Sequence, residues 1–128
     1  MNILDEDISA PECEQLRTHK IHFRQIGVEI GRSGMKDYEG IIPLLHRLKR
    51  PTFFTLDHGF YHPRLQYRGY YLVFLDVWED EAAAYVRRFL RHPEFRTQSQ
   101  RMGKVACVRR RGVSYWQAQM RGERAFGW

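Results

Sequence analysis

A length of 128 residues, with 43% of them hydrophobic and 28% charged, suits one folded domain and is too short for two. No uncharged apolar stretch approaches the ~20 residues that a membrane-spanning helix needs, so we expect no transmembrane segment. The formal net charge of +6 lies entirely in residues 101–128, because residues 1–100 contain equal numbers of basic and acidic side chains.

Strand and helix patterns alternate through the first half of the chain. Short apolar or alternating runs indicate strands, and apolar residues at helical spacing after a capping or acidic residue indicate helices. The expected elements are a strand at 1–4, a helix at 9–18, a strand at 21–26 and a helix at 37–48. Pro43 is tolerated in a helix only near the first turn, which favours a later start for the fourth element.

The second half continues this alternation after Pro51. The expected elements are strands at 52–56 and 70–77, a helix at 79–91, and strands at 104–108 and 113–116. Strands that alternate with helices favour an α/β fold, in which helices flank a central, mostly parallel sheet. We divide the chain into an α/β domain at 1–112 and a basic, aromatic C-terminal extension at 113–128.

Acidic residues directly follow two of the expected strands. Asp5 and Asp7 come after the first strand, and Asp57 comes after the strand at 52–56. The carboxyl ends of parallel strands meet at one edge of a sheet, where open α/β sheets bind ligands. Asp37 and Glu39 open the helix between these strands. Converging carboxylates repel one another unless a proton or a divalent cation neutralises them, so the pattern predicts a shared metal site.

Simpler roles are open to several of these acids. Asp7 could cap the following helix, and Asp37 could complement a helix dipole. Asp76 also follows a strand, where helix capping explains it better than metal binding does. Asp5 and Asp57 are harder to explain in this way, because a buried acid at the end of a central strand costs desolvation energy without a partner.

Three short motifs carry a resemblance to a known family. They are Leu-Asp-Glu-Asp at 4–7, Lys-Asp-Tyr-Glu at 36–39 and Thr-Leu-Asp-His-Gly-Phe at 55–60. In this order they resemble the small PIN-like domains related to the toxin ribonucleases of bacterial toxin–antitoxin systems, over about the first 80 residues. The chain departs from the family pattern at Asp7, where the family has Asn, and at Gly59, where it has a second Asp.

The resemblance implies a three-layer α/β/α fold, a ribonuclease site that depends on Mg²⁺ or Mn²⁺, and often a small antitoxin partner. Asp5 and Asp57 would bind the ion directly, since Mg²⁺ needs only one or two carboxylates. Glu39 or Asp37 would act on the attacking water, and Asp7 or the acid before it would supply outer charge. The expected catalytic residues are thus Asp5, Glu39 and Asp57, and the expected metal ligands are Asp5, Asp7, Asp37 and Asp57.

Three functions follow from these patterns. The first is a metal-dependent endoribonuclease, acting as the toxin of a toxin–antitoxin pair. The second is a PIN-like fold that no longer cleaves and instead binds RNA or a protein, which the missing acid at Gly59 favours. The third is a phosphoacceptor receiver domain, which needs a hydroxyl residue after the fourth strand and a Lys after the fifth. Here Asp76 follows the fourth strand and Lys104 begins the fifth.

Basic and aromatic side chains are interleaved near the C-terminus. Arg109, Arg110 and Arg111 can attract phosphates through counterion release, and Trp116 can stack on bases, so we expect a nucleic-acid-binding surface here. A solvated tail or a site for an acidic protein partner would explain the same composition. Further aromatic residues suit either a homodimer surface or the core, namely Tyr61, Tyr67, Tyr70 and Tyr71.

The N-terminal residues bear on the cellular location. They include acidic side chains where a secretory signal would be basic and then apolar, which predicts a cytoplasmic protein. In that compartment we expect Cys13 and Cys107 to be reduced, buried side chains rather than a disulfide or a reactive thiol.

Overall fold

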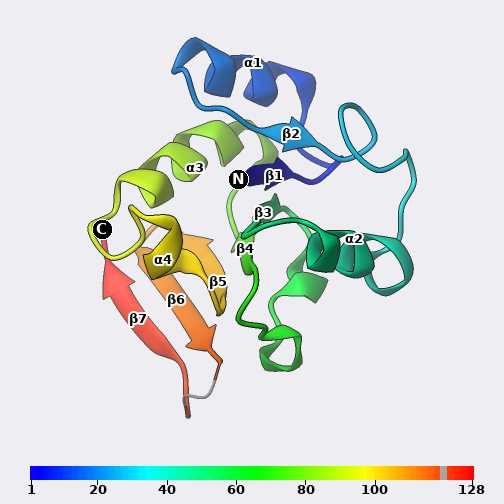
Figure 1. Cartoon of the computed structure of the whole chain (residues 1–128). Coiled ribbons are helices and arrows are strands. Elements are labelled where there is room, and N and C mark those ends of the chain that lie inside the picture. The colour runs from blue at the N-terminus through cyan, green and yellow to red at the C-terminus, as the bar shows by residue number, and fades with distance from the viewer. Residues whose placement is uncertain (119–120) are drawn as a thin grey trace.

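The computed structural model describes residues 1–118 and 121–128 and shows an α/β fold built on one mixed sheet (Figure 1). In these residues the sheet has seven strands in the order β2-β1-β3-β4-β5-β6-β7. The first five strands in that order run parallel, and β6 and β7 run antiparallel to their neighbours. The strands are β1 (Asn2–Leu4), β2 (Arg24–Gln25), β3 (Thr52–Thr55), β4 (Tyr71–Leu75), β5 (Lys104–Arg109), β6 (Gly112–Gln117) and β7 (Arg124–Gly127).

Helices and single helical turns connect the parallel strands. The helices are α1 (Ala10–Thr18), α2 (Ile42–Arg47), α3 (Ala82–Arg91) and α4 (Gln98–Arg101). Pro11 and Pro43 lie in the first turns of α1 and α2, where the missing N–H costs no intrahelical hydrogen bond. A π-helical turn lies at Asp37–Ile41, and 3₁₀ turns lie at His58–Phe60, Pro63–Leu65 and Glu79–Glu81. Within the described residues, no helix combines the length and the apolar character needed to cross a membrane.

Apolar side chains cover both faces of the sheet. Successive side chains of a strand point to opposite faces, so β4 places Tyr71 and Val73 in one core cluster and Leu72 in the other. The first cluster also contains buried side chains of α1 and α3, and the second contains those of α2. Helices therefore pack on both faces, with α2 across the sheet from α1 and α3 (Figure 1).

Two of the four tyrosines considered for a dimer surface lie in the core. Tyr70 is 2% exposed and donates its hydroxyl hydrogen bond to the Leu65 carbonyl. Tyr71 is fully buried and packs edge-on against Phe89, with ring centroids 5.4 Å apart. Of the two interpretations left open by the sequence, the structure supports the core for this pair.

The segment at 113–128, predicted as a C-terminal extension, contributes strands to the sheet. β6 pairs with β5 along its whole length, and β7 pairs with β6. Val113 and Tyr115 are buried in the cluster that α1 and α3 cover, and the Tyr115 ring stacks on Phe126. These strands are therefore continuous with the parallel sheet and its core.

The expected elements are mostly present close to their predicted positions. The helix expected at 37–48 becomes α-helical only at Ile42, with Pro43 in its first turn, as the proline indicated. The strand expected at 21–26 is reduced to the two residues of β2. Neither α4 nor β7 was predicted, because each has only four residues and shows no apolar period that could be recognised.

Candidate functional site

The strand order places the ends of β1 and β3 at a topological switch point. β1 lies between β2 and β3, so the chain moves to one side of β1 with β2 and to the other side with β3. In doubly wound sheets this is the place where a crevice opens at the carboxyl edge and ligands bind. Asp5 follows β1, and its backbone N–H donates to the Phe54 carbonyl of β3 at 2.9 Å. The predicted acids therefore stand at the edge position that favours binding.

The hydroxyl group of Thr55, the last residue of β3, contacts all three acids at this edge. It lies 2.6 Å from Oδ2 of Asp5 and 3.3 Å from Oδ2 of Asp7. It also accepts a hydrogen bond of 3.0 Å from the backbone N–H of Asp57. A hydroxyl carries one proton, and the shorter distance assigns that proton to Asp5. Thr55 is fully buried, so the arrangement is held from inside the sheet.

Burial, and then the charges of neighbouring acids, raises the pKa of the two acids that share this hydroxyl. Burial raises the pKa of Asp5, and the charges of Asp57 and Glu6 raise it further. The hydrogen bond from Thr55 acts in the opposite direction and lowers it. The pKa of Asp7 rises to about 7, chiefly through burial of its carboxylate and then through the charge of Asp5. Asp7 is exposed as a residue, but its carboxylate turns inward and accepts the backbone N–H of Leu56 at 3.1 Å.

In the part of the chain that the structure describes, no ion pair compensates these charges. The ion pairs found among the described residues involve none of Asp5, Asp7 and Asp57. Each of the three acids instead relies on hydrogen bonds from N–H or hydroxyl groups. The cluster therefore carries unneutralised negative charge whenever Asp7 is ionised.

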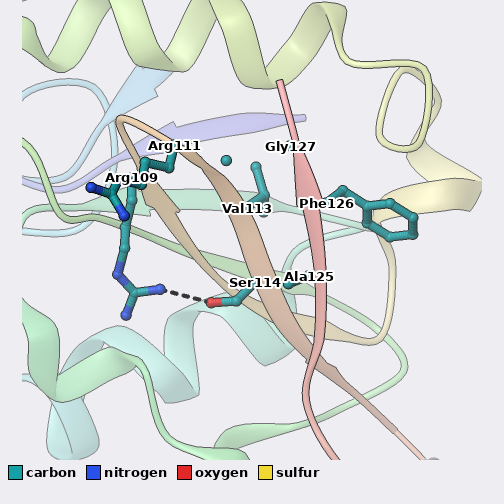
Figure 2. Close-up of a pocket in the computed structure, with 8 residues that line it drawn as sticks. Arg109, Arg111, Val113, Ser114, Ala125, Phe126 and Gly127 are labelled. Atoms are coloured by element: carbon teal, nitrogen blue, oxygen red, sulfur yellow. Dashed lines mark hydrogen bonds between the residues drawn. The ribbon is translucent and has the colours of Figure 1, made fainter.

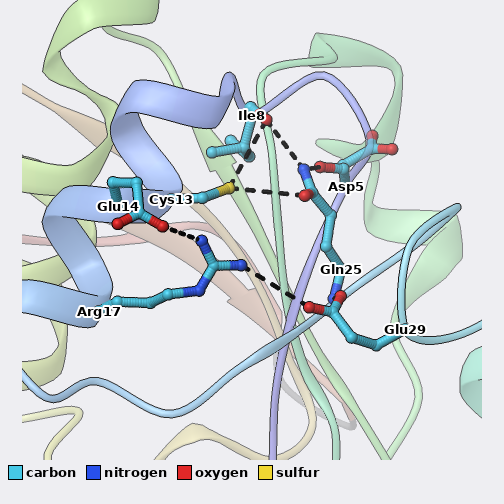
Figure 3. Close-up of polar contacts among 7 residues, drawn as sticks. All are labelled: Asp5, Ile8, Cys13, Glu14, Arg17, Gln25 and Glu29. Carbon is cyan, nitrogen blue, oxygen red and sulfur yellow. Dashed lines mark hydrogen bonds and ion pairs between the residues drawn. The ribbon is translucent and has the colours of Figure 1, made fainter.

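A buried glutamine fixes the turn that carries Asp5 and Asp7. The side-chain amide of Gln25 donates to the carbonyls of Asp5 and Ile8, at 3.1 and 2.9 Å, and accepts from the Cys13 thiol (Figure 3). These bonds tie β2 and α1 to the turn between β1 and α1. The acids therefore project from a braced segment, although the turn itself has no regular secondary structure.

Both cysteines are buried and free, which confirms the prediction of small buried side chains. Burial raises the pKa of Cys13, and it raises the pKa of Cys107 to about 12. Thiols with raised pKa values stay protonated near neutral pH and are poor nucleophiles.

Asp57 closes a tight turn with its own side chain. Its Oδ1 accepts the backbone N–H of Gly59 at 2.9 Å, at the start of the 3₁₀ turn His58–Phe60. A Cβ added at Gly59 would lie 3.2 Å from that oxygen, and the backbone there does not require glycine. An acidic side chain at this position, as in the PIN-like pattern, would stand directly beside Asp57.

The other predicted acids have different surroundings. Oxygens of Glu6 accept from the Ser33 hydroxyl and the Gly34 N–H, at 2.8 and 2.7 Å, and these bonds lower the pKa of Glu6. Glu39 is exposed and lines a separate cavity of about 460 Å³ together with residues of the loop after β2. The side chain of Asp37 lies outside the described part of the structure. The contacts described above thus join Asp5, Asp7 and Asp57, while Glu39 borders a cavity that none of these three residues lines.

The donor set fits a hard divalent cation, although its present geometry is incomplete. Within residues 1–118 and 121–128, apart from the side chain of Asp37, no group of three His, Cys, Asp or Glu side chains is arranged to hold a metal ion. Mg²⁺ and Mn²⁺ prefer carboxylate oxygens, and Mg²⁺ is often bound by one or two carboxylates with the remaining positions filled by water. Asp5 and Asp7, which share the Thr55 hydroxyl, would supply two such ligands.

Two of the predicted arginines line a cavity at the same edge of the sheet. Arg109 and Arg111 border a space of about 300 Å³ beside β6 and β7 (Figure 2). Arg109 donates to the Ser114 hydroxyl at 3.0 Å and pairs with Asp76 at 3.4 Å. Trp116 lies near the other end of β6, opposite Val105 at the beginning of β5. The arginines are therefore at the acidic edge of the sheet, and Trp116 is displaced toward the opposite edge.

Three residues of this region were not assigned roles from the sequence. Thr55 belongs to the third motif, and its place two residues before Asp57 was the available signal. Gln25 gave no signal, because its partners are backbone carbonyls on distant segments. Trp78 follows β4 at the acidic edge and is 72% exposed, which a sequence pattern alone does not reveal.

Comparisons with protein-family models, with curated proteins and with solved structures found no match to this chain. The function is therefore inferred from the geometry and chemistry of the site.

Proposed function

We propose that this chain is a PIN-like domain with a three-layer α/β/α arrangement, and that it acts as an endoribonuclease dependent on Mg²⁺ or Mn²⁺. The observation that carries this proposal is the convergence of Asp5, Asp7 and Asp57 on Thr55 at the switch point, with raised pKa values for Asp5 and Asp7. Carboxylates held together with no ion pair among the described residues form a site that gains from binding a cation.

Each residue of the cluster has a distinct role in this proposal. Asp5 and Asp7 would bind the ion directly, and Asp57 would act through water while its Oδ1 stays bonded to Gly59. Thr55 orients Asp5, and the N–H of Leu56 orients Asp7. A bound divalent ion would neutralise charge that develops on the phosphate and lower the pKa of a bound water.

The arginines at the same edge support a polyanionic substrate. Arg109, Arg110 and Arg111 lie at the turn between β5 and β6, at the carboxyl end of β5 and hence on the acidic edge. Contacts to phosphate position a nucleic acid without reading its sequence, so these residues support RNA binding and leave the cleavage specificity undetermined. A role as a toxin with an antitoxin partner is part of the proposal through the resemblance alone.

Cleavage of single-stranded RNA in the presence of Mn²⁺ tests the function. We expect the wild-type protein to cleave and Asp5→Asn to lose at least ~100-fold in rate, because one of two direct metal ligands is removed. Glu14→Gln is the matched control, since it removes one exposed negative charge from α1, away from the edge. Equal rates for the wild type and Asp5→Asn would refute the assignment of the site.

A second function, RNA binding without cleavage, is favoured by Gly59, which stands where the PIN-like pattern has an acid. Isothermal titration with Mn²⁺ separates the two functions. A nuclease should bind Mn²⁺ and lose affinity in Asp57→Asn, whereas a binding module should show no affinity that depends on a carboxylate.

The position of Lys104 argues against the third candidate, a receiver domain. Lys104 begins β5 and therefore lies at the amino edge of the parallel sheet, where its ammonium group donates to the Gln100 carbonyl. A lysine that stabilises a phosphoaspartate at Asp57 would have to lie at the opposite edge. Incubation with acetyl phosphate followed by measurement of the intact mass tests this point, and we expect no stable phosphate adduct.

A further inference from the structure

Trp78 differs from the other two tryptophans, all of which lie in the described part of the chain. It is 72% exposed, whereas Trp116 and Trp128 are half-buried. Trp128 has contacts for both its ring and its N–H: the ring lies 4.7 Å from the Arg88 guanidinium, and Nε1 donates to the Arg109 carbonyl. An indole that is largely in water offers most of its surface to a ligand.

The exposed ring lies at the acidic edge of the sheet. Trp78 follows the end of β4, and β4 pairs in parallel with β3 so that Phe74 lies opposite Thr55. The chain that leaves β4 therefore starts next to the chain that carries Asp57. Together with Asp76, Val77 and Arg110, Trp78 lines a cavity of about 280 Å³, which we call the Trp78 cleft.

Glu81 fixes the two principal groups of the Trp78 cleft relative to one another. Its Oε1 accepts the backbone N–H of Trp78 at 3.0 Å, and both of its oxygens accept from Nη2 of Arg110, at 3.1 and 3.3 Å. These same bonds lower the pKa of Glu81. The backbone of Trp78 and the guanidinium of Arg110 are thus held by one carboxylate before any ligand arrives, which reduces the entropy lost on ordering Arg110 when a ligand binds.

We propose that the Trp78 cleft binds single-stranded nucleic acid, with a base stacked on the Trp78 indole and a neighbouring phosphate on Arg110. Arginine binds phosphate through several parallel N–H donors, and Arg110 uses Nη2 for Glu81 while Nε and Nη1 have no partner in the described residues. Base stacking on an aromatic ring tolerates any sequence, because every base has a π-face.

Charge favours nucleic acid over an apolar protein surface as the occupant. Arg109 and Arg111 flank Arg110, and they line a second cavity on the same edge. Asp76, which lines the cleft, and Glu81 are already paired with Arg109 and Arg110. Glu79 and Asp80 follow Trp78 in the chain and are exposed, so the phosphate is expected on the arginine side of the ring.

This inference rests on the proposed function, because it places part of the RNA substrate beside the acidic cluster. It is tested without cleavage, by fluorescence anisotropy with a labelled oligouridylate of about 10 nucleotides in EDTA. We expect Trp78→Ala to weaken binding by roughly 5- to 150-fold, the loss of one stacked base, and Trp78→Phe to retain most of the affinity. Val28→Ala is the control, since Val28 is 70% exposed and lies in the turn after β2.

Further measurements test the phosphate contact of Arg110 and identify the type of nucleic acid that binds. Arg110→Ala should weaken binding and lower the slope of log K against log salt by about one. Quenching of tryptophan fluorescence by the oligonucleotide should be largely lost in Trp78→Phe. Parallel titrations with oligothymidylate compare DNA with RNA, and either ligand supports the stacking site if its binding depends on Trp78.

The outcomes distinguish this inference from the proposed function. Binding that depends on Trp78 without Mn²⁺-dependent cleavage would support the cleft and remove the nuclease. Cleavage and oligonucleotide binding that are both unchanged in Trp78→Ala would keep the nuclease and overturn the cleft, and the exposed indole would then suit a protein partner. An absence of oligonucleotide binding by the wild type would overturn the cleft as well.

Discussion

Thr55 shows how much one buried hydroxyl group can organise. It donates to the Asp5 carboxylate, lies next to the Asp7 carboxylate and accepts from the backbone of Asp57, so one atom contacts three residues that are up to 52 positions apart in the chain. The carboxylates come close because strand pairing brings them together. The pKa values of Asp5 and Asp7 are raised, first by burial and then by the charges of neighbouring acids.

Asp7 should titrate near pH 7 in the metal-free protein, because burial of its carboxylate and the charge of Asp5 raise its pKa to about 7. The folded-state pKa then lies above the unfolded value of ~3.9, so protonation of Asp7 stabilises the fold. This stabilisation is complete below the unfolded pKa and is lost as the pH rises through about 7. Carbon-13 NMR of the Asp7 carboxyl group measures the midpoint directly.

The same titration should change the thermal stability of the fold. The melting temperature of the wild type should fall between pH ~5 and ~8, and it should fall less in Asp7→Asn, which cannot ionise at this position. An NMR midpoint close to that of a solvated aspartate, or an unchanged pH dependence in Asp7→Asn, would contradict the described environment of Asp7.

Gly59→Asp should strengthen the site that the resemblance proposes. The new Cβ would lie 3.2 Å from Oδ1 of Asp57, so an added carboxylate would stand beside the cluster. We expect Mn²⁺ affinity to rise roughly tenfold, since affinity for hard cations grows with ligand charge. Without metal, repulsion should lower the free energy of unfolding by roughly 0.5–1 kcal/mol. Gly59→Asn is the matched uncharged control, and equal Mn²⁺ affinities in the two variants would argue against a cation site here.

At the scale of elements, the hairpin of β6 and β7 matters most for the architecture. Its apolar side chains alternate, so that Val113 and Tyr115 enter the core while Ser114 faces the Arg109 side. Tyr115 also packs edge-on against Phe95, with centroids 5.8 Å apart. A segment that buries its side chains in this way is expected to unfold together with the parallel strands.

Tyr115→Ala should therefore destabilise the whole fold rather than only the C-terminal segment. Removing a buried aromatic ring leaves a cavity, so we expect a loss of ~3–5 kcal/mol in the free energy of unfolding. Urea denaturation followed by circular dichroism measures this loss, with Tyr115→Phe as a control that keeps the ring. If the main transition stayed at the wild-type urea concentration, the hairpin would not be part of the cooperative unit.

At the scale of the whole molecule, the switch point joins the two halves of the parallel sheet. A cation bound there would be held directly by Asp5 and Asp7 after β1 and through water by Asp57 after β3, and would therefore stabilise the pairing of these two strands. Part of the excess positive charge of the chain lies at this edge as well, because Arg109, Arg110 and Arg111 are at the carboxyl end of β5, on the same side of the sheet as the acids.

Mn²⁺ should raise the melting temperature if the site binds it. A metal ion that binds the folded state and not the unfolded state raises the free energy of unfolding by ~2.7 kcal/mol when its concentration is a hundred times Kd. The shift should be larger at pH ~8 than at pH ~6, because metal and proton compete for Asp7. Differential scanning fluorimetry tests this, with Glu14→Gln expected to keep the shift and Asp5→Asn expected to lose it. A shift of equal size in Asp5→Asn would place the metal elsewhere.

Local patterns in the sequence determined the α/β class, the positions of most elements and the acids at the ends of β1 and β3. Period and proline placement act within a few residues, which is why α1, α3, β4 and the start of α2 could be predicted. The same patterns led to the prediction of a C-terminal extension at 113–128. They could not indicate that this segment joins the sheet, because the pairing of β6 with β5 is a contact that no local period encodes.

Only the tertiary structure decided which acids meet and what surrounds them. Asp7 rather than Glu39 joins Asp5, because the pairing of β1 with β3 brings Thr55 into contact with both Asp5 and Asp7, while Glu39 borders a cavity that neither of them lines. The brace from Gln25 and the exposure of Trp78 likewise depend on segments distant in the chain. Strand order sets these neighbours, and it arises from burying the apolar surfaces of the whole sheet at once rather than from any single stretch of sequence.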